Sequence, residues 1–354
     1  MKIFTENIDP STKSKLYDIA KTNIYGHIRV MPDVHEGSSI VGFTAIFTDK
    51  ISPNTLGPDI GCGVLCVNLG KLKNINLELF DHRLHKVIPS GFDVCEKNDK
   101  YFSKTKLNLR DLHCYKQLKN IPELERAAGT LGGGNHFIEL DKDSDENIYL
   151  VIHTGSRNLG KQVWQYYSNN CDLPSGYISE QSPLYLEYME DCNFCNRWAK
   201  ENRMLIAEKL IDVMKWNPGK DWKKKQTIDC AHNYMEYHMI RKGAIRCLDG
   251  EKVIIPINMR DGSIIATGLG NADWNFSGPH GAGRLMSRTE AKKSINLDEY
   301  KKTMSGIYTS SVNESTIDES PMAYKPITEI LSLIEDTVEI KNIIKPIYNY
   351  KHST

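Results

Sequence analysis

One histidine lies in a stretch whose neighbours are nearly all small. Residues 276–288 read FSGPHGAGRLMSR, with His280 between Pro279 and Gly281. Because glycine has no side chain, a ligand can approach this imidazole closely. His280 could therefore be a metal ligand, a general base, or a nucleophile that attacks phosphorus and forms a phosphoramidate, with Arg284 stabilising phosphate charge. A mobile loop histidine without a chemical role is the alternative interpretation.

Further residues with metal-binding side chains lie in turns or beside glycines, in the motifs GPDIGCGVLC, GTLGGGNHFIEL, VIHTGSRNLG and DCAHNYMEYH. Thiolates, carboxylates and neutral imidazoles all bind borderline divalent cations. Taken alone, the first motif is explained at least as well by a turn aspartate with a small buried cysteine. A glycine-rich turn with a hydrogen-bonded histidine explains the second about as well, and a polar strand end the third. One shared site explains the four motifs more simply than four unrelated coincidences do. That site would contain Asp59, Cys62, His136, His153 and His232.

Several other patterns carry less chemical information. No Gly-Lys-Ser/Thr follows the three glycines before Asn135, so that motif is not a P-loop, and the order HExxH is absent around His232. Cys192 and Cys195 have the spacing of zinc ligands but lack a second pair, and they lie in a helical stretch, which favours a structural role. The lysines of KDWKKKQ favour a solvated loop over a phosphate contact.

The composition is that of a globular protein. The 354 residues contain 45 Lys+Arg and 45 Asp+Glu, so net charge indicates no polyanionic partner and leaves room for a local basic cleft. Nine scattered cysteines argue against a disulfide framework and for a reducing compartment. The start of the chain has no apolar signal region and no apolar run is long enough to span a membrane. We expect a cytoplasmic protein with no membrane partner.

The elements that must position these residues mix strands and helices. SSIVGFTAIFTD, GVLCVNLG and NIYLVIHTGSR are typical of buried strands, and strand-like runs return over 244–265. Helical spacing predicts one long helix over about 182–216 and a second over about 325–340, with Ile327, Ile330 and Val338 on one face of the second. Strict βαβ alternation is absent. We therefore predict an α+β fold and not a doubly wound sheet.

Taken in order, MPDVHEG, GPDIGCGV, GTLGGGNHFIEL, IHTGSRNLG, HNYMEYH, SGPHGAGRLMSR and AYKPITEI resemble the motifs of the RtcB family of RNA ligases, from about residue 27 to about 351. The resemblance implies one catalytic domain over 1–354, with mixed sheets and flanking helices around a deep metal and nucleotide cleft. It also implies an enzyme of RNA repair or tRNA splicing. Such an enzyme joins an RNA 3′-phosphate, or a 2′,3′-cyclic phosphate, to a 5′-hydroxyl, with GTP as co-substrate and two Mn²⁺ ions.

The resemblance also implies residue roles. His280 would carry GMP as a covalent adduct, and Arg157 and Arg284 would lie near phosphates. Cys62 would bridge the two metal ions, with His136 and His153 on one ion and Asp59 and His232 on the other. A guanine nucleotide pocket would be formed by Asn135, Glu139, Pro256, Asn258, Ser263, Ala282, Gly283, Tyr324 and Lys351. Asp33 and His35 belong to a family motif to which we assign no role from the sequence.

The chain departs from the family at PINMRDGS, where Asn258 stands in place of a usual serine and Arg260 and Asp261 replace small residues. Zinc or cobalt could occupy the metal site instead of manganese. Two alternatives remain: a metal-dependent cyclic phosphodiesterase or phosphatase that has lost ligation, and a non-catalytic module that binds RNA ends. Neither needs both His280 and Lys351. The RNA substrate, the oligomeric state and any accessory protein are not determined by the sequence.

Overall fold

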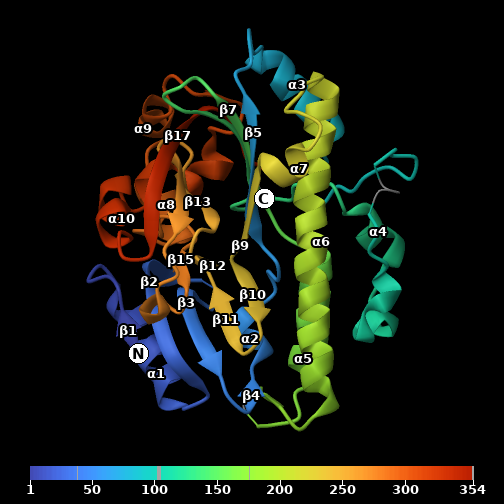
Figure 1. Cartoon of the computed structure of the whole chain (residues 1–354), viewed down its shortest axis with the longest axis vertical. Helices are drawn as coiled ribbons and strands as arrows, with labels where there is room; N and C mark the ends of the chain where they lie inside the picture. The colour runs from blue at the N-terminus through green and yellow to red at the C-terminus, as the bar shows by residue number, and fades with distance from the viewer. Residues whose placement is uncertain (38, 102–104, 175, 353–354) are drawn as a thin grey trace.

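The strand-forming runs build an eight-stranded sheet at the centre of the computed structural model, which describes residues 1–37, 39–101, 105–174 and 176–352 (Figure 1). The strands are ordered β13-β14-β17-β6-β7-β5-β9, with the short β16 beside β17. The two ends of the sheet approach each other, because the backbone N–H of Ile254 in β13 donates to Sγ of Cys230 in β9 at 3.4 Å. The sheet is thus nearly a closed barrel. Its strands are β5 (Gly63–Gly70), β6 (Phe137–Lys142), β7 (Ile148–Thr154), β9 (Thr227–Ala231), β13 (Lys252–Asn258), β14 (Gly262–Gly268), β16 (Tyr308–Thr309) and β17 (Val338–Tyr350).

Both faces of this sheet are covered. In β7, Val151 packs inside the barrel while its neighbours Leu150 and Ile152 pack outward against helices. Alternate side chains of a strand point to opposite faces, so a strand covered on both faces is apolar almost throughout. This explains the continuous apolar runs, and it confirms the predicted strands in GVLCVNLG and NIYLVIHTGSR.

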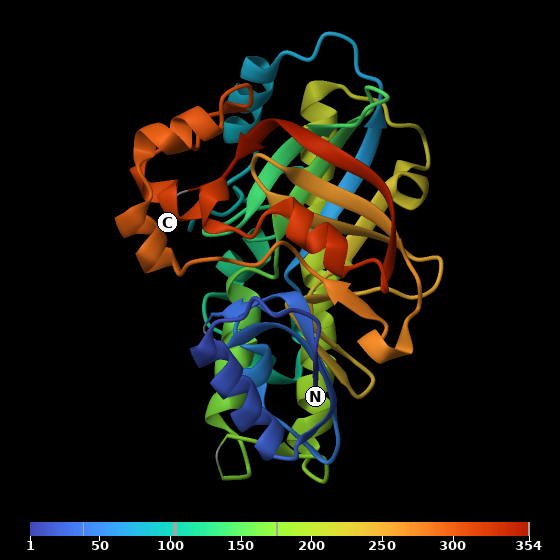
Figure 2. The ribbon, with the colours of Figure 1, turned by 90° about the vertical axis from the view of Figure 1, so that its left-hand side faces the viewer.

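A five-stranded sheet lies beside the barrel, below it in Figure 2, in the order β1-β2-β3-β11-β10. All of its neighbours pair antiparallel except β1 and β2. Two small two-stranded sheets complete the β structure, and the fold is α+β as predicted. The bounds are β1 (Lys2–Ile3), β2 (Tyr25–Glu36), β3 (Ile40–Phe47), β10 (Asn233–Glu236), β11 (Met239–Lys242), β4 (Lys50–Ile51) with β8 (Ile178–Ser179), and β12 (Ala244–Arg246) with β15 (Ser277–Pro279).

The predicted long helix is confirmed as α6 (Pro183–Met214), which runs alongside strands of both large sheets (Figure 1). The Ser182 hydroxyl caps it by accepting from the Leu184 backbone N–H at 3.3 Å. The apolar positions Phe194, Trp198 and Leu205 are buried, and so is the CNFC stretch. In the described part of the chain, α6 and the other helices all fall short of the length of apolar sequence that a membrane span requires.

The remaining helices are short and lie around the sheets. The α-helices are α1 (Pro10–Lys21), α2 (Pro53–Leu56), α3 (Leu77–Val87), α4 (Ile121–Arg126), α5 (Asn158–Asn169), α7 (Trp222–Lys225), α8 (Arg288–Ser294), α9 (Leu297–Thr303) and α10 (Ile327–Leu333). Turns of 3₁₀-helix are η2 (Leu109–Asp111), η3 (His113–Gln117), η4 (Ala272–Trp274), η5 (Glu314–Glu319) and η6 (Pro321–Ala323).

Two local predictions are wrong. The second predicted helix ends at Leu333, and Val338 begins β17 instead. Its β-branched residues pair with β14, with Val338 opposite Gly268, and the barrel gains a strand between β14 and β6. The lysine-rich stretch expected to be a loop contains the single helical turn α7, in which Lys223 pairs with Glu208 of α6.

Arg203 of α6 is completely buried and ties α6 to three strands. Its guanidinium donates to both carboxylate oxygens of Asp229 in β9, at 2.7 and 3.1 Å. It also donates to the carbonyl of Gly61, before β5, at 3.0 Å and to that of Thr154, at the end of β7, at 2.9 Å. A two-point ion pair with further hydrogen bonds satisfies both buried charges.

We predict that Arg203→Met lowers the free energy of unfolding by about 3–5 kcal/mol, because Asp229 would keep a charge without its partner. Urea denaturation measures the change. Lys301→Ala, which removes the exposed pair with Asp298, is the control and should change stability by less than about 1 kcal/mol. Equal stability of the two variants would contradict the anchoring role of Arg203.

Candidate active site

The residues that the sequence singled out gather around a cleft of about 1050 Å³. The cleft receives side chains from both large sheets and from the segment that follows β15. Cys62 and His136 are buried against its lining residue His153, whereas Arg157 and Ser263 do not line it. The predicted residues that line the cleft are Asp59, Asn135, Glu139, His153, His232, Pro256, Asn258, His280, Ala282, Gly283, Arg284, Tyr324 and Lys351.

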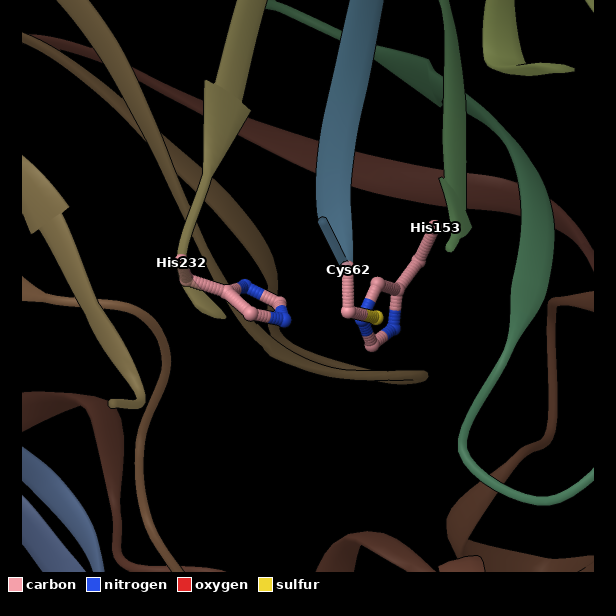
Figure 3. Close-up of side chains that lie close together, drawn as sticks. All are labelled: Cys62, His153 and His232. Atoms are coloured by element: carbon pink, nitrogen blue, oxygen red, sulfur yellow. The ribbon is translucent and has the colours of Figure 1, made fainter. Parts of the chain in front are cut away.

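Strand pairing brings Cys62, His153 and His232 together. Cys62 directly precedes β5, which pairs antiparallel with β7 on one side and β9 on the other, so Val64 lies opposite both His153 and Cys230. Just beyond β9, the backbone N–H of His232 donates to the Cys62 carbonyl at 2.8 Å. One ligand atom from each of the three side chains lies within 4.8 Å of the others, and the side chains converge (Figure 3).

A second group shares Cys62. Ligand atoms of Asp59, Cys62 and His136 also lie within 4.8 Å of one another. The Cys62 sulfur is 3.6 Å from Nε2 of His136 and 3.2 Å from Nε2 of His153. Cys62 thus belongs to both groups. These groups divide the other four candidate ligands differently from the partition that the resemblance implies, which stays a prediction. His153 lies in β7 and His232 directly follows β9, the two strands that flank β5, and His136 directly precedes β6.

Backbone carbonyls orient two of the imidazoles. The Nδ1 atom of His136 is 2.9 Å from the Leu131 carbonyl, and that of His153 is 3.0 Å from the Asn135 carbonyl. A carbonyl only accepts, so each Nδ1 carries the proton and each Nε2 presents its lone pair toward Cys62. Metal-binding histidines are commonly held in this way.

The electrostatics of the cluster favour a cation. Burial lowers the pKa of His136 to about 3, and it holds the pKa values of His153 and His232 well below the usual value, so all three imidazoles are neutral at pH 7. Burial also raises the pKa of the Cys62 thiol, and the nearby Asp59 carboxylate raises it further. A divalent cation would displace the thiol proton and relieve this repulsion. The donor set of one sulfur, one carboxylate and three imidazoles therefore fits a metal site.

His280 is held by a buried carboxylate. Oδ2 of Asp33, in β2, accepts from Nδ1 of His280 at 2.6 Å and from the backbone N–H groups of His280 and Gly281 at 2.9 and 3.1 Å. Nε2 is left for the cleft, and the ring centroid lies 4.7 Å from that of His232. Gly283 permits this contact, because a Cβ there would lie 2.4 Å from the Asp33 carbonyl oxygen and its φ is +74°.

A buried ionic network forms another part of the wall. Nζ of Lys351 lies 2.8 Å from Glu319, and the Tyr324 hydroxyl donates to the same carboxylate at 2.7 Å. Burial opposes ionisation of Glu319, but the charges of Lys351, Arg288 and Arg284 outweigh it and lower its pKa to about 2. Glu319 is a carboxylate that fixes two predicted pocket residues. Sequence reasoning missed it, and its only signal was an acidic residue shortly before AYKPITEI.

Glu139 is poised between two charge states. Burial raises its pKa to about 7, although Lys351 and the 2.6 Å hydrogen bond from Asn349 Nδ2 lower it in part. Its side chain lines the cleft. Near neutral pH it can therefore gain an acceptor charge when a ligand supplies hydrogen-bond donors.

Lys242 is a second residue that sequence reasoning missed. It is 4% exposed and lines the cleft at the end of β11. Burial lowers its pKa, and the neighbouring groups Asp59 and Cys62 partly restore it. The motif RKGA contains it, but no charge pattern in the sequence set this lysine apart from the exposed ones.

The residues that depart from the family pattern form the turn between β13 and β14. Asn258 Nδ2 donates to Asp261 at 2.9 Å, and the Arg260 backbone N–H donates to Asn258 Oδ1 at 3.0 Å. Asn258 also lines the cleft. Ser263 is wholly buried, and its hydroxyl has no hydrogen-bond partner among the described residues. In this turn, polar side chains that hydrogen-bond within the turn therefore stand in place of the small residues of the family pattern.

Comparison with known proteins gives a consistent result. A family model described as "tRNA-splicing ligase RtcB" matches residues 15–352. The chain is 29% identical over 386 residues to the RNA-splicing ligase RtcB of Escherichia coli K12, with 96% of this chain and 94% of that protein covered. It is 28% identical over 399 residues to the tRNA-splicing ligase RtcB of Aeropyrum pernix, with 85% and 82% covered.

We predict that Cys62→Ala binds Mn²⁺ roughly tenfold or more weakly than the unmodified chain, because Cys62 belongs to both ligand groups. Equilibrium dialysis followed by elemental analysis measures the bound metal. Cys192→Ala removes a buried thiol of the CNFC stretch and serves as the matched control, with unchanged metal binding. Undiminished Mn²⁺ binding in Cys62→Ala would exclude this cluster as the metal site.

Proposed function

The chain belongs to the RtcB family, and on that premise we propose that it is an RNA ligase that joins RNA ends in tRNA splicing or RNA repair. The observation that carries the proposal is the pair His280 and Asp33. A buried carboxylate holds Nδ1 of an imidazole whose Nε2 faces a large cleft beside the Cys62 cluster. That arrangement is typical of an activated nitrogen nucleophile.

We propose that GTP supplies the energy for joining. Nε2 of His280 attacks the α-phosphorus, an N–P bond forms, the bond from that phosphorus to the bridging oxygen breaks, and pyrophosphate leaves. The imidazole gains positive charge in this step, and Asp33 stabilises it through the Nδ1 proton. Asp33 is a positioning residue, since it acts on the substrate only through His280.

The GMP group then passes to the RNA. An oxygen of the RNA 3′-phosphate attacks the phosphorus of the adduct and releases His280, which leaves an RNA end capped by a diphosphate linkage to guanosine. The 5′-hydroxyl of the second end attacks the RNA phosphorus, GMP departs, and the hydroxyl proton is lost to solvent. A 2′,3′-cyclic phosphate must first be opened by water to the 3′-phosphate.

We propose two divalent cations, Mn²⁺ in the first instance, at the two ligand groups. Cys62 would serve both ions, with Asp59, His136, His153 and His232 completing the two ligand sets. Such ions supply charge neutralisation for phosphates and for the attacking and leaving oxygens of a displacement. The chain's own contribution is to keep these imidazoles neutral and to fix the Nε2 lone pairs of His136 and His153.

The guanine base would be selected by complementary hydrogen bonds. An ionised Glu139 accepts from the N1–H and 2-amino groups of guanine, which adenine cannot supply in this arrangement. Lys351 is held by Glu319 and keeps further N–H donors for an acceptor on the base. Pro256, Ala282 and Tyr324 supply the cleft walls around them. Because these residues come from distant parts of the chain, we propose that residues 1–354 act as one catalytic unit.

The test is intact-mass spectrometry after incubation with GTP and MnCl₂. The unmodified chain should gain the mass of one GMP, and His280→Ala should gain none. Asp33→Asn should form the adduct roughly 100-fold or more slowly, because the imidazole loses its charged partner. A folded protein that gains no GMP with Mn²⁺, Co²⁺ or Zn²⁺ would overturn the ligase proposal in favour of a metal-dependent phosphodiesterase or phosphatase.

We predict that guanosine affinity falls as the pH drops below about 7, approaching tenfold per pH unit, because Glu139 must lose a proton to accept from guanine. Its raised pKa places this loss near neutral pH. Guanosine is the probe because it has no phosphate that titrates in this range. Calorimetric titration of Glu139→Gln should show weaker binding without the slope. A pH-independent affinity in the unmodified chain would show that Glu139 does not contact the base as a carboxylate.

A further inference from the structure

Phe92 is the most exposed large apolar side chain in the described part of the molecule, at 96%. It lies in the connection that follows α3, within the sequence PSGFD. Single exposed apolar residues are common on protein surfaces. Phe92 differs from such residues in two respects: hydrogen bonds hold the backbone of its turn, and a polar side chain is bonded to that turn.

The turn that carries Phe92 is anchored to the glycine-rich segment before His136. The Gly91 backbone N–H donates to the Gly132 carbonyl at 2.9 Å, and the Leu131 N–H donates to the Pro89 carbonyl at 2.9 Å. The turn itself is closed by a 3.1 Å hydrogen bond from the Asp93 N–H to the Ser90 carbonyl. The backbone therefore presents the aromatic ring outward from a fixed position.

Gly91 makes this presentation possible. Its φ is +61°, and a Cβ would lie 2.7 Å from the His352 ring. The Ser90 hydroxyl lies 2.9 Å from that of Tyr350, near the end of β17. The turn is thus clamped between the glycine-rich segment and the end of the chain that carries Lys351.

Arg157 connects this turn to the start of the glycine-rich segment. Its Nη2 donates to the Gly91 carbonyl at 2.8 Å and its Nε to the Thr130 hydroxyl at 3.2 Å. On the other side of the glycine-rich segment, Asn135 is exposed and lines the cleft. No atom lies within 4 Å of the Cβ position of Gly134, so there is open space beside this segment. The turn of Phe92 and the side chain of Arg157 are thus both bonded to the segment that ends at the cleft residue Asn135.

This combination fits single-stranded nucleic acid. A half-buried arginine and an exposed amide can contact phosphates, while an exposed aromatic ring can stack on a base of any identity.

We propose that Phe92 is a stacking platform for a nucleobase of an RNA strand that reaches the active site past Arg157. The proposal rests on the proposed RNA ligase function and deepens it. Nucleotides close to the reacting end do not contact Phe92. A base further along the strand stacks on Phe92, and this contact fixes the direction in which the strand crosses the surface. Because stacking is tolerant of base identity, the contact favours single-stranded ends over particular sequences.

The test measures binding of short single-stranded RNAs by fluorescence anisotropy, with a 5′-hydroxyl strand in one arm and a 3′-phosphate strand in the other. Phe92→Ala should raise the Kd of one strand by roughly 5- to 150-fold, the range for loss of one base stack, and leave the other unchanged. Phe92→Trp should bind at least as well as the unmodified chain, and Phe92→Leu should resemble Phe92→Ala. Tyr237→Ala removes an 87% exposed aromatic side chain from the turn between β10 and β11. It is the control and should not change either Kd.

A series of strands with one abasic nucleotide at each position identifies the stacked base. At that position alone, the abasic substitution should weaken binding to the unmodified chain and have little effect in Phe92→Ala. Unchanged Kd values for both strands in Phe92→Ala, or losses that are equal at every abasic position, would overturn the proposal. Failure of the proposed function gives a different result, because the unmodified chain would then form no GMP adduct or bind neither strand.

Discussion

The active site depends on two adjacent side chains of α6. Arg203 binds Asp229, which lies three residues before His232. It also binds the carbonyl of Gly61, directly before Cys62, and that of Thr154, directly after His153. The Oδ1 atom of the neighbouring Asn202 accepts from the backbone N–H groups of Gly129 and Thr130, and its Nδ2 donates to the carbonyls of Thr130 and Gly155. Through these contacts, one helix fixes four chain segments that carry the proposed metal ligands. A rigid support of this kind is what a precise site requires.

The barrel explains why the chemistry lies at its end. The strands β5 and β7 are apolar on both faces, so their site residues lie where these strands begin or finish, whereas Glu139 lies within β6. At this end of the barrel, neutral and charged side chains occupy different parts of the site. Burial keeps His136, His153 and His232 neutral beside Cys62, as cation ligands must be, while three cations keep Glu319 ionised deeper in the wall. Asp33 adds a second fixed carboxylate, reserved for His280. Burial thus sets the neutral state of the three imidazoles, and cations from other segments set the ionised state of Glu319.

The glycine-rich segment contacts both the proposed metal site and the proposed RNA-binding surface. Its carbonyls orient His136 and His153, and its backbone also holds the turn that carries Phe92. A change in that segment would therefore affect the proposed metal ligands and the proposed RNA path together. The polar turn at Asn258 and Arg260 lies on a different wall and leaves this arrangement intact.

The sequence by itself predicted features that depend on neighbouring residues. Continuous apolar runs identified β5 and β7, helical spacing identified α6, and the combination of motifs identified the side chains around the cleft. Tertiary structure decided what depends on contacts between distant residues. It brought the candidate metal ligands together around Cys62, and it set the bond between Asp33 and His280, 247 residues apart, and the role of Glu319. It also ended the last predicted helix at Leu333, because Val338 pairs with β14 of the barrel. The periodicity of side chains in a short apolar run cannot predict a strand partner that lies far away in the sequence.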